Sequence, residues 1–61
     1  MPLIEVKLYE GRLNAETAPA LVEKFTNVLV EVFGEGVREH TTVLLEEVSP
    51  RNWGVAGKAG A

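Results

Sequence analysis

The chain has 61 residues, of which 46% are hydrophobic, and its formal net charge is −3. A domain of roughly 60 residues buries only about 60% of the surface that its unfolded form exposes, so it commonly relies on disulfides, a metal or oligomerisation. The sequence has no cysteine and one histidine, which excludes disulfides and a zinc site. Because the apolar content is too high for a disordered peptide, we expect the chain to associate with other chains.

The distribution of charge and hydrophobicity argues against nucleic acids and membranes as partners. The six basic residues are scattered and form no stripe. No window approaches the roughly 20 apolar residues of a membrane span, and no basic region followed by an apolar core marks a signal peptide. We therefore expect one cytoplasmic domain over residues 1–61, without internal repeats.

Two segments have the pattern of β-strands. Residues 3–9 alternate apolar and polar side chains, as in a half-buried strand. Residues 40–48 contain a run of β-branched and aliphatic side chains, which suits a strand covered on both faces. After a turn, the glycine-rich residues 53–57 suit a small hairpin, and residues 57–61 lack a pattern and are expected to be loose.

One segment between these strands has the pattern of an amphipathic helix. Apolar side chains recur at helical spacing from about Ala18 to Phe33. Asn14 or Thr17 could cap this helix. A cap at Thr17 puts Pro19 in the first turn, where its missing N–H costs little, whereas a cap at Asn14 puts it a turn further in, where it would cost a backbone bond. We therefore expect a helix that is firmly formed from about Thr17. Gly34 ends the helix, as glycine commonly does past a C-terminus.

The order strand, helix, strand predicts an α+β fold built on a β-α-β unit. Two strands joined by such a helix lie parallel, with a right-handed crossover. One helix on a two-stranded sheet leaves a sheet face and both edges uncovered, so we expect the sheets of neighbouring subunits to pair. A short C-terminal hairpin completes the predicted subunit.

Pro2 follows Met1 directly and has two possible states. If Met1 is retained, the proline nitrogen is a tertiary amide without a proton. If Met1 is removed, as the small second residue favours, the chain begins with a secondary amine. A model α-amino group has a pKa of about 7.7–8.0, and desolvation lowers it. Such a group is suited to abstract a proton next to a carbonyl at neutral pH.

The order of these features resembles the 4-oxalocrotonate tautomerase family over nearly the whole chain. The features are Pro2 after Met1, the turn 10–12 (Glu-Gly-Arg), the single amphipathic helix, and Glu47-Val48 leading into residues 52–57 (Asn-Trp-Gly-Val-Ala-Gly). The resemblance implies a small β-α-β subunit whose sheets pair between subunits. It also implies a homo-hexamer that uses no cofactor and acts on a small enol or keto carboxylate.

The resemblance also implies roles for individual residues. Pro2 would act as the general base, and Arg12 would bind the substrate carboxylate from an adjacent subunit. Trp53 would line the pocket and keep the proline dry. Tyr9 and Val55 match positions that border the same pocket.

One position departs from the family pattern. Thr42 stands where enzymes of the family that act on dicarboxylate dienols carry a second arginine. Loss of such an electrostatic donor typically costs around 2.7–4 kcal/mol of transition-state stabilisation. Arg38 or His40 could replace it if the preceding loop folds inward. No acid lies between Trp53 and Gly57 to activate water, which disfavours a hydratase or dehalogenase.

Each candidate residue also has a structural interpretation. Pro2 could begin a strand, and Arg12 could be a surface residue after a turn. Trp53 could fill a core or an interface. His40 could be a strand-edge or interface histidine, and Tyr9 could donate a hydrogen bond to the enol oxygen instead of bordering the pocket.

The sequence thus predicts a cofactor-independent keto–enol tautomerase acting on a 2-hydroxydienoate or similar enol carboxylate. Thr42 keeps a second hypothesis open, in which the chain is a non-autonomous subunit of a hetero-hexameric enzyme of this family. A third hypothesis is a binding module whose proline is incidental. The natural substrate, the removal of Met1 and the stereochemistry of proton transfer are left open by the sequence.

Overall fold

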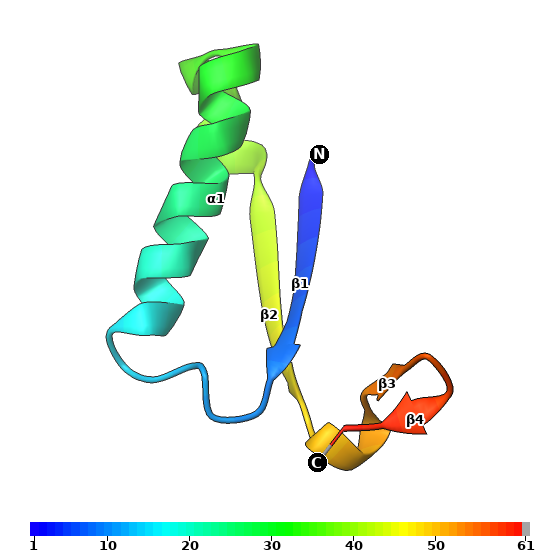
Figure 1. The fold of residues 1–61 in the computed structure, drawn as a ribbon. Helices are drawn as coiled ribbons and strands as arrows, with labels where there is room; N and C mark the ends of the chain where they lie inside the picture. Colours follow the sequence, from blue (N-terminus) through cyan, green and yellow to red (C-terminus); the bar gives the residue numbers. More distant parts are fainter. Residues whose placement is uncertain (61) are drawn as a thin grey trace.

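A computed structural model describes residues 1–60 and contains one long helix beside a two-stranded sheet, followed by a small hairpin (Figure 1). The elements in chain order are β1 (Leu3–Tyr9), α1 (Thr17–Phe33), the 3-10 helix η1 (Glu35–His40), β2 (Thr42–Val48), the 3-10 helix η2 (Pro50–Asn52), β3 (Gly54–Val55) and β4 (Lys58–Ala59). The predicted β-α-β unit and C-terminal hairpin are confirmed.

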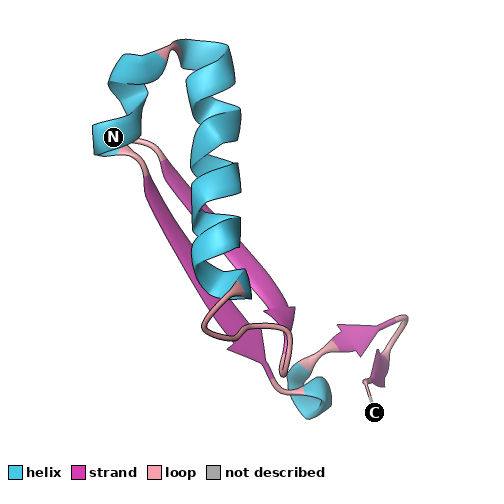
Figure 2. Cartoon of the chain, turned by 90° about the vertical axis from the view of Figure 1, so that its left-hand side faces the viewer, coloured by secondary structure: helices cyan, strands magenta, loops and turns pink. Residues whose placement is uncertain are grey.

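The central sheet consists of β1 and β2, which run parallel with Leu3 opposite Thr42 and Tyr9 opposite Val48. Helix α1 covers one face of this sheet (Figure 2). Successive side chains of a strand point to opposite faces, so alternate apolar residues lie beneath the helix. The half-buried residues of this set are Ile4, Val6, Leu8, Val43 and Leu45.

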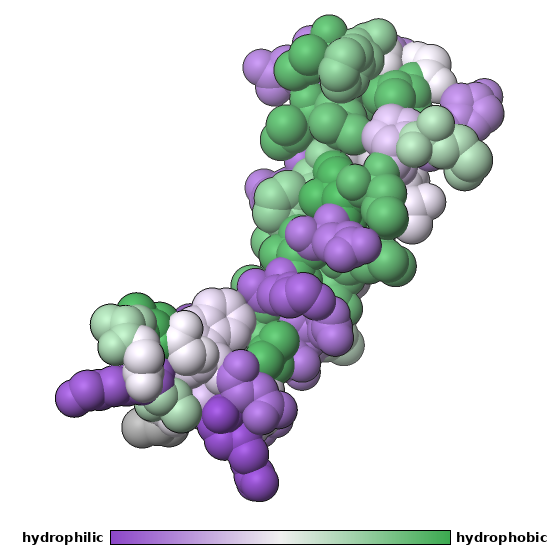
Figure 3. All heavy atoms as spheres, turned by 90° about the vertical axis from the view of Figure 1, so that its right-hand side faces the viewer, coloured by the Kyte–Doolittle hydropathy of each residue, from purple (hydrophilic) through white to green (hydrophobic). Residues whose placement is uncertain are grey.

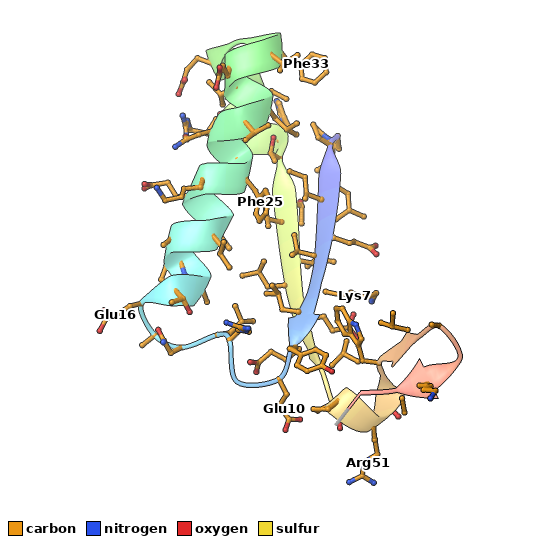
Figure 4. All side chains as sticks on the ribbon, in the orientation of Figure 1. Lys7, Glu10, Glu16, Phe25, Phe33 and Arg51 are labelled. Atoms are coloured by element: carbon orange, nitrogen blue, oxygen red, sulfur yellow. The ribbon has the colours of Figure 1, made fainter. Side chains whose placement is uncertain are left out.

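Helix α1 follows the expected amphipathic pattern. Phe25 points toward the sheet (Figure 4), and Thr26 is buried with its hydroxyl donating to the Val22 carbonyl at 2.8 Å. The helix ends at Phe33 because Gly34 adopts a φ of +97°, and the Gly34 N–H donates to the Val30 carbonyl at 2.8 Å. A positive φ is readily available only to glycine.

Neither candidate residue occupies the N-cap position of α1, although the side chains of both form hydrogen bonds at its start. Glu16 occupies the N-cap position and makes no side-chain capping bond. The Asn14 Oδ1 accepts the N–H groups of Glu16 and Thr17, each at 2.8 Å, and the Thr17 Oγ1 accepts the N–H of Asn14 at 2.9 Å. These reciprocal bonds satisfy donors that a helix start otherwise leaves free.

The second strand is shorter than predicted, because it begins at Thr42 and not at His40. His40 belongs to η1, which Thr41 closes with two bonds: its N–H donates to the Arg38 carbonyl at 3.3 Å and its Oγ1 donates to the Val37 carbonyl at 2.7 Å. Thr41 is β-branched and would suit a strand, but its hydroxyl donates to a carbonyl of η1, so the strand begins one residue later.

The C-terminal hairpin extends further than predicted. Lys58 and Ala59 were expected to be loose, but they pair antiparallel with β3. Ala56 and Gly57 have φ values of +54° and +81° and form the two-residue turn, as type I′ hairpin turns require. Residue 61, the end of the predicted loose segment, lies outside the described residues.

The face of the sheet opposite α1 is uncovered. This open face is formed by Leu3, Glu5, Lys7, Thr42, Leu44 and Glu46, which are all exposed. Leu3 and Leu44 are 55% and 52% exposed, and Figure 3 shows a broad apolar surface on this side, interrupted by polar groups. No hydrophobic side chain within residues 1–60 is fully buried. The subunit alone therefore lacks the sealed core that a stable domain requires.

Candidate active site

The sheet carries predicted site residues at both of its ends. At the amino end of β1, the Pro2 carbonyl accepts a hydrogen bond from the Thr42 N–H at 3.0 Å. This bond continues the ladder of the parallel sheet by one residue and fixes the backbone of Pro2 beside the start of β2. Pro2 is half-buried, whereas Met1 is 97% exposed. We call Pro2 and Thr42 the proline end of the subunit.

The other end of the sheet contains Tyr9, Arg12, Trp53 and Val55, which we call the arginine end. The rings of Tyr9 and Trp53 pack edge to face with their centroids 5.1 Å apart. Val55 lies on β3 with 66% of its surface exposed. The structure thus brings together the aromatic and apolar residues that were expected to border a pocket.

Gly60 attaches the hairpin to this aromatic pair. Its N–H donates to the Trp53 carbonyl at 2.6 Å. A Cβ at Gly60 would overlap the Tyr9 hydroxyl and would lie 2.9 Å from the Pro50 carbonyl oxygen. Only glycine allows the chain to pass this close to Tyr9, so the position of Trp53 depends on Gly60.

Arg12 lies in the loop between β1 and α1. Its N–H donates to the Tyr9 carbonyl at 3.3 Å, and its carbonyl accepts the Thr17 hydroxyl at 3.0 Å. Its side chain is exposed, and within residues 1–60 the guanidinium makes no hydrogen bond or ion pair. A free guanidinium on a fixed loop is suited to bind a carboxylate from outside the chain.

The backbone next to Arg12 is bound by Glu47, a residue that entered the sequence analysis only as one feature of the family resemblance and not as a candidate site residue. Its Oε2 accepts the N–H of Gly11 at 2.7 Å and the N–H of Leu13 at 3.1 Å. The available signal was a carboxylate at a position where the alternation of Val43 and Leu45 calls for an apolar residue.

The proline end and the arginine end are far apart within one chain. They are separated by the seven residues of β1 (Leu3–Tyr9), which at about 3.3 Å per residue correspond to roughly 20 Å. Figure 1 shows the N-terminus at one end of the sheet and the hairpin at the other. One substrate of small size cannot contact Pro2 and Arg12 of the same subunit.

The two candidate replacements for a second arginine lie within η1. The Arg38 Nε donates to the Glu35 Oε1 at 2.6 Å, which lowers the pKa of the Glu35 carboxyl and raises the pKa of Arg38. His40 is exposed, with its Nε2 3.7 Å from the Glu39 Oε1. Arg38 is therefore paired within its own helix, whereas the His40 side chain makes no hydrogen bond within residues 1–60.

The described part of the chain contains neither a metal-binding cluster nor a helix that could span a membrane. Residues 1–60 contain no cluster of three or more histidine, cysteine, aspartate or glutamate side chains with the geometry of a metal site. None of the helices in this range has the length and apolar character needed to cross a membrane.

The sequence and the fold match those of known tautomerases. The family model described as "Tautomerase enzyme" matches residues 2–60. A probable tautomerase from Ralstonia nicotianae is 44% identical over 57 residues, which cover 93% of this chain and 79% of that protein. A 2-hydroxymuconate tautomerase from Pseudomonas putida is 37% identical over 57 residues, which cover 93% of this chain and 87% of that protein.

Solved structures agree with the sequence comparisons. TomN, a 4-oxalocrotonate tautomerase homologue in the tomaymycin biosynthetic pathway, gives a TM-score of 0.84 at 40% identity and covers 95% of this chain and 86% of its own. YwhB, another homologue of 4-oxalocrotonate tautomerase, also gives 0.84 at 38% identity and covers 95% and 92%. This chain belongs to the tautomerase family, and the resemblance found in the sequence is confirmed. Membership places it among the isomerases.

Proposed function

We propose that the protein is a cofactor-independent keto–enol tautomerase that acts on a 2-hydroxydienoate or similar enol carboxylate. The observation that carries this proposal is the division of the predicted site between the two ends of one sheet. Pro2 lies at one end, and Arg12 with Trp53 lies at the other. Family membership supports the same class of reaction.

The proposed active site forms between subunits. A two-fold axis places the same surface of two subunits in contact, so that every contact between two different residues occurs twice. If one end of the first subunit meets the opposite end of the second, the reverse contact forms as well. An antiparallel arrangement would bring the proline end of one subunit to the arginine end of its neighbour. The open face, with Leu3 and Leu44, supplies apolar surface for such contacts. We propose a homo-oligomer and, following the family resemblance, a hexamer.

The proposed reaction uses the Pro2 amine and the side chains at these two ends. With Met1 removed, the neutral Pro2 amine takes the hydroxyl proton of the enol, and the electron pair of the O–H bond stays on the oxygen of the resulting dienolate. The prolinium then gives its proton to a carbon of the dienolate; a C=C electron pair forms the new C–H bond as the oxygen pair forms the carbonyl. Arg12 of the neighbouring subunit holds the substrate carboxylate in a bidentate pair. The proximity of base and bound substrate supplies much of the rate.

The apolar residues of the arginine end would control the protonation of the base. Trp53 and Val55 would exclude water from the neighbouring Pro2 amine and lower the pKa of the prolinium. Tyr9 is packed against Trp53, so we assign it to the wall of the pocket. Thr42 would donate a hydrogen bond to the enolate oxygen at the proline end.

The first experiment is intact-mass spectrometry of the purified protein under denaturing conditions. One sample is first treated with a small α-keto acid and borohydride. We expect loss of Met1 and a single reduced adduct, which fragmentation of the intact protein places on the Pro2 amine. Retained Met1 or an adduct at another residue would contradict Pro2 as the base.

A second candidate function is that of a subunit in a hetero-hexameric tautomerase. Thr42 supports it, because the proline end has no free guanidinium, with Arg38 bound to Glu35. Such a subunit would contribute its Arg12 to a site whose second arginine comes from another chain. Purified alone it would be inactive and would gain activity on mixing with a partner, whereas a homo-oligomeric enzyme is active alone.

A further inference from the structure

Glu47 breaks the pattern of the strand that carries it. Val43, Leu45 and Glu47 alternate along β2 on the side of the sheet that carries α1, where Val43 and Leu45 are half-buried and Glu47, opposite Leu8, is exposed. A strand under a helix normally continues its apolar alternation. We explain the glutamate at this position by the hydrogen bonds that its carboxylate accepts from the backbone of residues 11 and 13.

Both bonds of the Glu47 carboxylate go to the loop that contains Arg12. The Gly11 and Leu13 N–H groups donate to the same oxygen, Oε2, at 2.7 and 3.1 Å. They lie 36 and 34 residues away in sequence, so the contact ties β2 to the loop after β1. Hydrogen bonds to an ionised acceptor are about twice as strong as neutral ones.

The two amides flank Arg12, whose own backbone groups are also bonded. Its N–H donates to Tyr9 and its carbonyl accepts the Thr17 hydroxyl. Gly11 has a φ of +93°, which directs its N–H into this arrangement at little cost. The backbone on both sides of Arg12 is therefore held by β1, β2 and the start of α1.

The guanidinium of Arg12 is left free by this arrangement. Within residues 1–60 the Glu47 carboxylate is occupied by backbone amides, and neither its oxygens nor any other carboxylate pairs with Arg12. Because the backbone that carries Arg12 is already fixed, the side chain loses less entropy on binding an anion than it would on a mobile loop. Its guanidinium also needs no release from a carboxylate of the same chain.

We propose that Glu47 is a positioning residue, which fixes the loop of residues 11–13 so that Arg12 presents its guanidinium to the substrate carboxylate in the neighbouring subunit. The proposal rests on the proposed function, because it assumes that Arg12 binds substrate. It assigns Glu47 no contact with the substrate.

The test compares Glu47→Leu, Glu47→Gln and Glu31→Gln. Leucine continues the apolar alternation of β2 and removes the acceptor, whereas glutamine keeps an oxygen for the two amides. Glu31 is the control, because it is an exposed glutamate on α1 whose side chain makes no hydrogen bond or ion pair within residues 1–60. With 2-hydroxymuconate as the probe, we expect Glu47→Leu to raise KM about tenfold and to change kcat little. We expect Glu47→Gln to restore most of the binding and Glu31→Gln to leave KM unchanged.

A double variant separates positioning from a general structural role. If Glu47 acts through Arg12, Glu47→Leu adds no further loss in an Arg12→Ala background. An equal loss in both backgrounds, or a KM unchanged in Glu47→Leu, overturns the proposal.

A readout without substrate covers the case in which the enzyme is inactive or the leucine variant does not assemble. In the wild type we expect a backbone order parameter for Arg12 near about 0.85, and in Glu47→Leu, or in Glu47→Gln to a smaller extent, a lower value. An unchanged order parameter in the folded variants overturns the proposal. Lack of any tautomerase activity in the wild type refutes the proposed function instead, and the order parameters still decide whether Glu47 positions Arg12.

Discussion

The Tyr9 ring at the end of β1 packs edge-on against the Trp53 ring, with an interplanar angle of 79°. The two residues are 44 positions apart in sequence, and this contact holds the C-terminal hairpin against the end of the central sheet. Tyr9 pairs with Val48 across the sheet, so the same residue belongs both to the sheet and to the hairpin junction. The aromatic wall of the proposed pocket therefore depends on how tightly the hairpin is docked.

Substitution of Gly60 tests that docking. In Gly60→Ala the added methyl group would overlap the Tyr9 hydroxyl, so the hairpin must move. We expect the free energy of unfolding to fall by about 1–3 kcal/mol, as is typical when an added group overpacks a close contact. Trp53 is the one tryptophan of the chain, so its fluorescence reports the change. Gly36→Ala is the matched control, because a methyl group there meets open space; equal effects in both variants would contradict the role of Gly60.

Replacement of Pro2 tests the base. We expect Pro2→Ala to lower kcat by about a hundredfold or more, because a positioned general base contributes roughly 10²–10⁴-fold. The oligomer should persist, since Pro2 joins the sheet through its carbonyl, which alanine retains. Steady-state kinetics and native mass measure the two properties. Pro19→Ala, in the first turn of α1, serves as the control for loss of a proline; full activity in Pro2→Ala would refute the mechanism.

Mixing two inactive variants tests whether the site is shared between subunits. Pro2→Ala retains the arginine end, and Arg12→Ala retains the proline end. After unfolding and joint refolding at equal amounts, random assembly gives an intact Pro2 and an intact Arg12 with a probability of one half each, so about a quarter of the sites recover. Activity measured before and after mixing gives the result. No recovery would show that both residues must come from one chain.

Introduction of arginine at Thr42 tests the departure from the family pattern. We expect Thr42→Arg to raise kcat/KM for 2-hydroxymuconate by about 10²–10³-fold, which corresponds to the roughly 2.7–4 kcal/mol that one electrostatic donor contributes. Thr42→Gln has similar bulk without the charge and should show no gain. If the arginine variant is no faster than the glutamine variant, Thr42 does not face the substrate.

The Lys7–Glu46 pair on the open face predicts a pH dependence. The hydrogen bond and the charge of Glu46 raise the pKa of Lys7 above its ordinary value. Because the folded pKa exceeds the unfolded one of about 10.4, the pair stabilises the fold below that pH and the contribution is lost as the pH rises through the folded pKa. Exposure keeps the effect small in a single subunit.

An NMR titration measures this shift directly. The side-chain signals of Lys7 should titrate at higher pH in the wild-type protein than in Glu46→Gln, which removes the charge and the ionised acceptor. A Lys7 that titrates at the same pH in both proteins would show that the pair does not persist in solution.

Local patterns predicted most of the fold because they are set by neighbouring residues. The alternation of apolar and polar residues predicted β1, and the helical spacing of apolar residues predicted α1. The start of β2 was predicted too early, because the Thr41 side chain bonds to η1 and ends it. The strand β4 was missed because two residues carry no periodicity, and its position depends on Gly60 reaching Trp53.

The candidate residues came from the sequence, and the family resemblance already implied that Arg12 acts from an adjacent subunit. The structure adds the physical reason, because β1 extends between Pro2 and Arg12 and keeps them apart within one chain. The contact of Glu47 with Gly11 joins residues 36 positions apart, which no local pattern reveals.

The placement of Pro2 and Arg12 at opposite ends of one strand has an evolutionary consequence under the proposed arrangement. Each site takes its proline end from one chain and its arginine end from another, so two copies of a duplicated gene can each supply one end. One copy then needs to retain only a functional proline end, and the other only a functional arginine end. Selection on the two ends becomes separable once two copies co-assemble, and a substitution such as that at residue 42 is tolerated in a chain whose partner supplies the missing charge. The same geometry makes a single defective copy harmful in a mixed assembly, because it spoils a site in its neighbour.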